Sequence, residues 1–242
     1  GMTMIFVLIY ILLAGLLIKS FYTHYISERR KYFSFDDRRF TDDDYLKVQD
    51  LNIEKLERIF LFLMLFLFLL TLGVHLFVDP VLSIWLIALF VSSMLTLSLI
   101  VDIRLYTISY DRSHLVMSVI WGAIIAAIFI FLYMRGTSDV DMTFETDQAV
   151  MMPADISYEY AEIDAVELVS SLPEIPFNHN VLGTIGQRHG SFTEGEDFYS
   201  LNVEDQSADI LLIEIEGVQI YLNDADEAVT NEWHETLKER IE

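Results

Sequence analysis

The sequence predicts an α+β protein in which four transmembrane helices precede a small β-barrel or β-sandwich with a carboxyl-terminal capping helix. Three observations predict this fold class. Long apolar runs fill residues 1–134 and are absent from the rest of the chain. Short segments of alternating polarity begin near residue 142, and the final residues repeat an apolar side chain at every fourth position.

Each apolar run has the length of a membrane span. Three of them contain 20 or 21 residues without Asp, Glu, Lys or Arg. At about 1.5 Å per residue they reach the roughly 30 Å of a hydrocarbon core. The first run is shorter, but it continues through Lys19, whose long stem keeps its amine at the interface. The predicted spans are residues 4–18, 59–78, 81–101 and 115–134.

Basic residues in the connecting segments predict the orientation. Residues 19–58 contain nine Lys or Arg, residues 102–114 contain two, and the link of Asp79 and Pro80 contains none. The positive-inside rule therefore places both basic segments in the cytoplasm, and the amino terminus and the carboxyl-terminal domain outside. Arg135, directly after the fourth span, opposes this orientation. We interpret the charged loop 19–58 as a solvated surface, with docking of an adaptor protein as the alternative.

The charge of the chain is concentrated after the last span. The net charge is −22, and residues 135–242 contain 25 Asp or Glu against four Lys or Arg. Such a surface repels nucleic acid and anionic lipid headgroups, so we exclude nucleic acid as a partner and do not expect phosphoinositide binding. The chain has no cysteine, which excludes thiol nucleophiles and zinc sites built on cysteine.

The predicted spans lack the charged and amide side chains that usually line a path for a solute. Their interiors contain no Asp, Glu, Lys, Arg, Asn or Gln, and His75 lies near a span end, where we expect headgroup depth. The hydroxyls of Ser92, Ser93, Thr96 and Ser98 could line such a path, but hydroxyls of this kind more often bond to helix carbonyls or to a neighbouring helix. Transport by this chain alone is therefore not expected. Small residues in the fourth span instead predict close helix packing, within the chain or against a second protein. These helix-packing candidates are Gly122, Ala123, Ala126 and Ala127.

The remainder divides into a linker, residues 135–141, and a β domain, residues 142–242. Val218 to Leu222 follow Gly217 in a clear hairpin pattern. Asp224 and Glu227 resemble a capping box that starts the terminal helix, in which an apolar stripe recurs every fourth residue. The seven candidate strands are residues 142–152, 156–160, 165–170, 181–188, 198–203, 210–216 and 218–223.

Short motifs in this domain resemble those of bacterial pleckstrin-homology-like domains that follow several membrane spans. In that family a Leu-Pro step, a glycine and a basic-X-Gly-X-Phe element precede a hairpin, an Asn-Asp pair and a helix. The resemblance implies a pleckstrin-homology-like fold and binding of a protein or peptide, without catalytic residues. The matching positions, with structural or binding roles, are Pro173, Gly183, Arg188, Gly190, Phe192, Asn223 and Asp224.

No constellation of residues points to catalysis, and we expect no catalytic residue, cofactor or enzyme activity. Ser191 and His189 form the one imaginable hydrolase pair, without a nucleophile-elbow motif around the serine. We expect Arg188 to pair with a nearby acid such as Glu194 or Glu196.

Binding of a divalent ion by Glu194, Glu196 and Asp197 stays open, with a solvated hairpin tip as the default.

The sequence thus favours a non-catalytic integral membrane protein that displays an acidic domain for protein or peptide binding, or for assembly, at the cell envelope. Its partner would be another protein or a second copy of the chain. The alternative is an accessory or immunity-type subunit of a membrane transporter complex, working through its helices.

Overall fold

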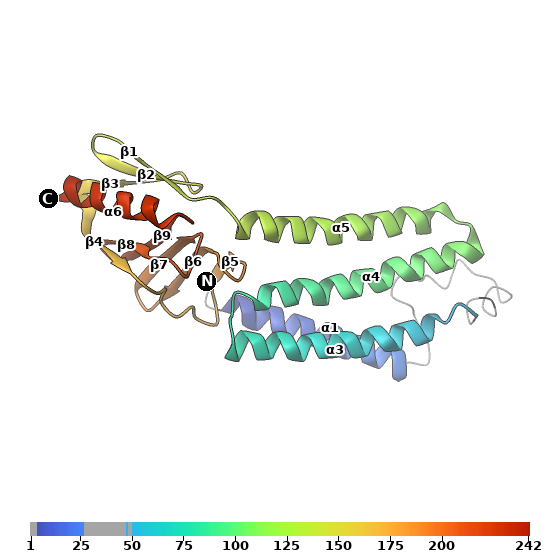
Figure 1. Ribbon diagram of the computed structural model, residues 1–242. Coiled ribbons are helices and arrows are strands. Elements are labelled where there is room, and N and C mark those ends of the chain that lie inside the picture. Colours follow the sequence, from blue (N-terminus) through green and yellow to red (C-terminus); the bar gives the residue numbers. More distant parts are fainter. Residues whose placement is uncertain (1–3, 27–46, 48–49) are drawn as a thin grey trace. The chain divides into compact units, whose positions relative to one another are not determined.

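The computed structural model describes residues 4–26, 47 and 50–242 (Figure 1). Most of the charged loop predicted at 19–58 therefore lies outside the described residues. The chain forms two compact units. We call residues 7–78 and 83–130 the helical unit. The β unit comprises residues 131–242 together with residues 79–82 and the described residues up to Phe6.

Four long helices confirm the predicted membrane region, because each is long and apolar enough to cross a membrane. All four extend beyond the predicted spans. The third continues eight residues past position 101, and only Tyr110, with φ 53°, and Asp111 separate it from the fourth. The helices are α1 (Ile5–Tyr25), α3 (Ile53–Phe77), α4 (Ser83–Ser109) and α5 (Arg112–Gly136).

Apolar side chains hold α1, α3 and α4 together within the helical unit. One cluster joins Leu17 of α1, Met64 of α3 and Phe90 of α4. A second cluster joins Ile53, in the first turn of α3, to Leu105 near the end of α4. Most side chains of α5 are exposed, as expected for a helix that meets lipid.

Nine strands form the two sheets of the β unit, where the sequence predicted seven strands. The predicted strand 142–152 is a hairpin, and the predicted strand 181–188 is interrupted by a loop at 184–187. The strands are β1 (Asp141–Phe144), β2 (Gln148–Met152), β3 (Ile156–Glu159), β4 (Ile163–Val169), β5 (Asn180–Gly183), β6 (Arg188–Glu194), β7 (Asp197–Val203), β8 (Ile210–Ile215) and β9 (Val218–Asn223).

The larger sheet has the order β4-β8-β9-β7-β6-β5, and β1, β2 and β3 form the smaller sheet. Neighbouring strands are antiparallel except β7 and β9, which pair in parallel. The predicted hairpin around Gly217 is present as β8 and β9. Gly217 has φ 68°, a left-handed conformation that suits glycine at a tight turn.

The terminal helix α6 (Glu227–Ile241) contacts β4 and β8, as Figure 1 shows. The predicted stripe is confirmed, since Trp233 and Leu237 are buried in the core beneath it. The cap is Asp226 and not Asp224, because Asp226 Oδ1 accepts a hydrogen bond from the Ala228 amide at 3.0 Å. Asp224 instead accepts from the amide of Asp226 at 2.7 Å.

Candidate functional site

The link between α3 and α4 belongs to the β unit. Arg188, at the start of β6, forms an ion pair with Asp79 in this link. Its guanidinium also donates hydrogen bonds to the backbone carbonyls of Thr184 and, at 2.8 Å, Gln187. The expected pairing of Arg188 with Glu194 or Glu196 is wrong, because β6 extends away from Arg188 and ends at Glu194.

The ion pair is needed because Arg188 is buried. Only 5 % of its side-chain surface is exposed, against 21 % for Asp79. Burial lowers the pKa of Arg188, and the Asp79 carboxylate opposes this shift. An arginine side chain stays charged in proteins, so the buried cation depends on Asp79 and on the two carbonyls for its stabilisation.

His179 makes a second connection to the link. Its Nε2 atom lies 3.0 Å from the Pro80 carbonyl oxygen, and its Nδ1 atom accepts a hydrogen bond from the Val181 amide at 3.0 Å. These partners require the ring hydrogen on Nε2, since a carbonyl oxygen only accepts. The Phe6 ring lies 4.7 Å from the His179 ring, and the Phe6 amide donates to Asn178 Oδ1 at 3.1 Å.

Apolar and backbone contacts complete this arrangement. Val81 is fully buried in a core cluster with Val181 and Phe192. Gly136, the last residue of α5, packs so closely on Gly183 that a Cβ atom at position 136 would lie 3.2 Å from Gly183 Cα. We call residues 79–81 with His179, Gly183 and Arg188 the helix-link site.

Of the positions that carried the family resemblance, Gly183 and Arg188 lie in the helix-link site. Gly190 has φ 141°, and a Cβ atom there would lie 2.0 Å from the Asn180 carbonyl oxygen, so it allows β5 and β6 to approach. Phe192 is buried and stacks on Tyr199 with the ring centroids 4.7 Å apart.

The other three positions lie outside the helix-link site, with Asn223 at the end of β9 and Pro173 and Asp224 in connecting segments. Pro173 is half-buried in the segment between β4 and β5. Asn223 is fully buried, and its amide group makes four hydrogen bonds with the backbone of residues 204, 205 and 209. The Asp224 amide donates a hydrogen bond to Oγ1 of Thr230, which lies in the first turn of α6, at 3.0 Å.

His189 is buried beside Gln187, with 2.9 Å between His189 Nε2 and Gln187 Oε1. Burial lowers the pKa of His189 to about 4. The imidazole is therefore neutral at physiological pH, held between β5 and β7 opposite Leu182 and Asn202.

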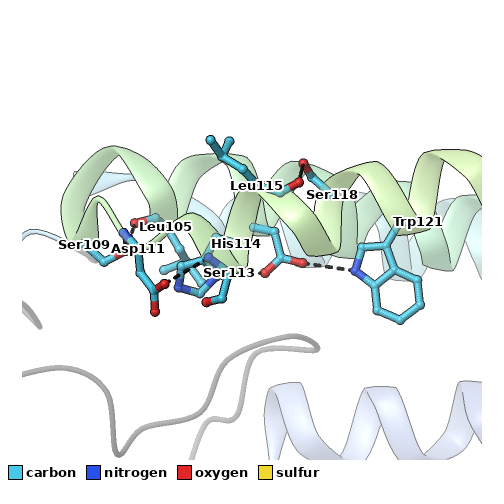
Figure 2. A network of polar contacts seen from close by, with 9 residues as sticks. Leu105, Ser109, Asp111, Ser113, His114, Leu115, Ser118 and Trp121 are labelled. Carbon is cyan, nitrogen blue, oxygen red and sulfur yellow. Dashed lines mark hydrogen bonds and ion pairs between the residues drawn. The ribbon is translucent and has the colours of Figure 1, made fainter.

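A buried carboxylate in the helical unit was missed from the sequence. The carboxylate of Asp102 on α4 lies 3.0 Å from His114 Nδ1 and accepts a hydrogen bond from Trp121 Nε1, also at 3.0 Å. Figure 2 shows His114 and Trp121, both from α5, with the dashed lines that mark these contacts. The sequence predicts a connecting segment at 102–114, because the apolar run ends at residue 101, although Asp102 lies in α4 and His114 in α5.

Three further polar contacts between side chains join the helices of this unit. His24 Nδ1 on α1 lies 3.1 Å from Glu57 Oε2 on α3. His75 is buried, with its Nδ1 atom 3.0 Å from the Tyr10 hydroxyl and 2.9 Å from that of Ser83. The sequence therefore predicted the place of His75 near a helix end, but not its burial.

The small residues of α5 are mostly exposed. Gly122 is half-buried beside α4, where an added Cβ atom would lie 3.6 Å from Leu99 Cδ1. Ala123, Ala126 and Ala127 are exposed.

The acids at residues 194–197 form the turn between β6 and β7, around Gly195. Over the described residues, no group of three or more His, Asp or Glu side chains is arranged to hold a metal ion.

Comparisons with protein-family models, with curated proteins and with solved structures gave no match. The resemblance to pleckstrin-homology-like domains therefore stays a prediction, carried by the residues named above.

Proposed function

We propose that this protein is a non-catalytic integral membrane protein that holds an acidic β domain at the bilayer surface, where the domain binds a protein or peptide partner at the cell envelope. The helix-link site is the observation that carries the proposal. Residues 79–82 connect two helices of membrane length, so they must lie at a membrane surface. In this proposal the β strands that bury Val81, and Arg188 as the partner of Asp79, lie at the same surface.

Charge supports a proposal for the kind of partner. Residues 135–242 contain 25 Asp and Glu but only four Lys and Arg. The domain therefore attracts a basic segment and repels an acidic one. Electrostatic attraction of this kind depends on ionic strength, because salt screens exposed charges over about 10 Å at 0.1 M.

The binding test uses the full chain in nanodiscs of zwitterionic lipid. A lysine-rich peptide, a neutral peptide of equal length and a glutamate-rich peptide serve as probes, and binding is measured at low and high salt. We expect saturable binding of the lysine-rich peptide that weakens with salt. Equal responses to all three peptides would contradict the proposal.

The orientation is tested with single cysteines, which are unambiguous because the chain has none. Glu196→Cys lies on the β6–β7 turn, and Tyr110→Cys lies at the exposed α4–α5 turn. On intact cells, a membrane-impermeant maleimide is expected to label position 196 and to leave position 110 unlabelled until the cells are opened. The reverse pattern would place the domain in the cytoplasm.

A further inference from the structure

Ile185, in the loop between β5 and β6, is the most exposed large hydrophobic side chain of the described β domain. Its exposed fraction is 83 %, whereas Met152, Ile156 and Phe198 are each exposed by about 40 %. A single exposed hydrophobic side chain is common in proteins, so this exposure carries an inference only together with the position and surroundings of the loop.

Hydrogen bonds to its backbone carbonyls hold the loop in place, with the Ile185 side chain pointing outward. The Ile185 carbonyl accepts from Gln206 Nε2 at 2.9 Å, and the Gly186 carbonyl accepts from the Gln206 amide at 2.9 Å. The Thr184 carbonyl accepts from the Arg188 guanidinium. The loop backbone is thus anchored on both sides of Ile185, while its side chain stays uncovered.

The loop is bounded by two residues of the helix-link site. Ile185 is two residues from Gly183, which packs on the end of α5, and three from Arg188, which pairs with Asp79. An extended chain covers at most about 3.6 Å per residue, so the Ile185 Cα atom lies within roughly 11 Å of the Cα atoms of Gly183 and Arg188.

Apolar surface continues on the membrane helices up to these same contacts. Val78, directly before Asp79, is 73 % exposed, and Met134, two residues before Gly136, is 66 % exposed. Apolar side chains in a membrane-length helix favour the hydrocarbon layer. Along the chain, apolar exposure therefore continues to residue 78, directly before the helix-link site.

Charge separates this part of the β domain from the rest. Residues 175–193 contain no Asp or Glu, although the chain after residue 134 contains 25 of them. This stretch includes the loop and the residues that contact the link. Carboxylates are repelled by anionic headgroups, so the absence of Asp and Glu from this stretch suits contact with a bilayer.

We propose that loop 184–187 lies in the interfacial layer of the membrane with the Ile185 side chain among the upper acyl carbons. The loop is a point of lipid attachment in addition to the helices. This inference deepens the proposed function and rests on it, because the loop reaches lipid only if the β domain is held at the bilayer surface. The occupant of this surface is lipid; a protein partner on Ile185 is an outcome that the experiment distinguishes.

The test places an environment-sensitive fluorophore on Ile185→Cys in the full chain, reconstituted in phosphatidylcholine vesicles. Gly186→Cys is a second position, because a Cβ atom there meets nothing within 4 Å. Glu196→Cys is the matched control. It follows the far end of β6, whose seven residues cover about 20 Å.

We expect blue-shifted emission from the fluorophore at position 185, and loss of fluorescence with lipids that carry a quencher near the top of the acyl chain. The control is expected to respond to aqueous iodide and not to these lipids. Identical responses at positions 185 and 196 would overturn the inference. So would protection of position 185 that appears only in native membranes, because that result identifies a protein partner.

The same vesicles separate this inference from the proposed function. Lysine-rich peptide binding with a solvent-exposed fluorophore at position 185 would overturn the loop insertion alone. Lipid quenching at position 185 without any peptide binding supports the insertion and contradicts the binding function.

Discussion

At the scale of single residues, the two partners of the Arg188–Asp79 ion pair are not equivalent. Asp79→Asn leaves a buried guanidinium without its counter-charge, whereas Arg188→Met leaves a carboxylate that is already partly exposed. We expect Asp79→Asn to cost about 3–5 kcal/mol of unfolding free energy and Arg188→Met clearly less.

The stability losses of the two variants can be compared by unfolding the detergent-solubilised chain, with Trp233 as the fluorescent reporter of the β unit. Trp85→Phe and Trp121→Phe remove the other two tryptophans from the signal. The double variant of Asp79 and Arg188 is expected to resemble Arg188→Met alone. A larger loss from Arg188→Met than from Asp79→Asn would show that the buried charge is not the main contribution.

His189 predicts a pH dependence of stability. Its pKa of about 4 in the folded protein is below the ordinary value of 6.5, so the unfolded chain takes up a proton first as the pH falls. The β unit should therefore lose stability from about pH 6.5 down to about pH 4, with no further loss from this group below that range. The total loss is on the order of 3 kcal/mol.

Carboxylates also titrate at the lower end of this range, so the comparison is with His189→Gln. Trp233 unfolding of both proteins at a series of pH values gives the difference curve. We expect the variant to lack the part of the slope between pH 6.5 and 5. Identical slopes in the two proteins would exclude His189 as its source.

At the scale of elements, Gly190 decides whether β5 can pair with β6. Gly190→Ala would place a Cβ atom 2.0 Å from the Asn180 carbonyl oxygen in a backbone with φ 141°. We expect the edge strand β5 to separate, with faster hydrogen exchange at the β5 amides that bond to β6.

Gly195→Ala is the control for this prediction. Gly195 also has a positive φ, 64°, but an added Cβ atom meets nothing within 4 Å. Its cost should be limited to the strain of a left-handed residue, about 1–2 kcal/mol, and exchange in β5 should not change. Equal exchange in β5 for both alanine variants would contradict the steric explanation.

The elements themselves were predictable to different degrees. Apolar runs predicted all four membrane helices, but not their ends, because α4 continues through Asp102 and Arg104 after the apolar run has stopped. The alternation predicted the β8–β9 hairpin well. It failed at the predicted strand 181–188, since the apolar Ile185 continues the pattern although it belongs to a loop.

At the scale of the whole molecule, the β domain is not complete within its own part of the sequence. A fragment of residues 140–242 lacks Val81, which is fully buried in the domain core, and lacks Asp79. We expect the fragment to be less stable than the β unit of the full chain, because a core position is left empty and Arg188 is left without its counter-charge.

The fragment contains Trp233 as its one tryptophan, so its unfolding compares directly with that of the full chain without Trp85 and Trp121. The variant Arg188→Met is expected to recover part of the lost stability in the fragment and none in the full chain. A fragment as stable as the full chain would mean that the link contributes nothing to the domain.

Contacts between residues far apart in the sequence explain why the helix-link site was not predicted. Arg188 and Asp79 are 109 positions apart, and local reasoning offered Glu194 and Glu196 as the nearest acids. Gly183 and Arg188 were singled out by resemblance, yet nothing in their spacing indicated a partner between two membrane helices. Tertiary contacts fix such pairs, and a single sequence does not record them.

The burial of Val81 also has a consequence for biosynthesis. The ribosome makes residues 79–82 well before the strands that enclose them, so the link reaches the membrane surface while its future partners do not yet exist. The last hundred residues must then assemble around a segment that is already in place. A chain whose second and third helices inserted the wrong way round would present no Val81 to these residues, and its β domain would be left with a hollow core.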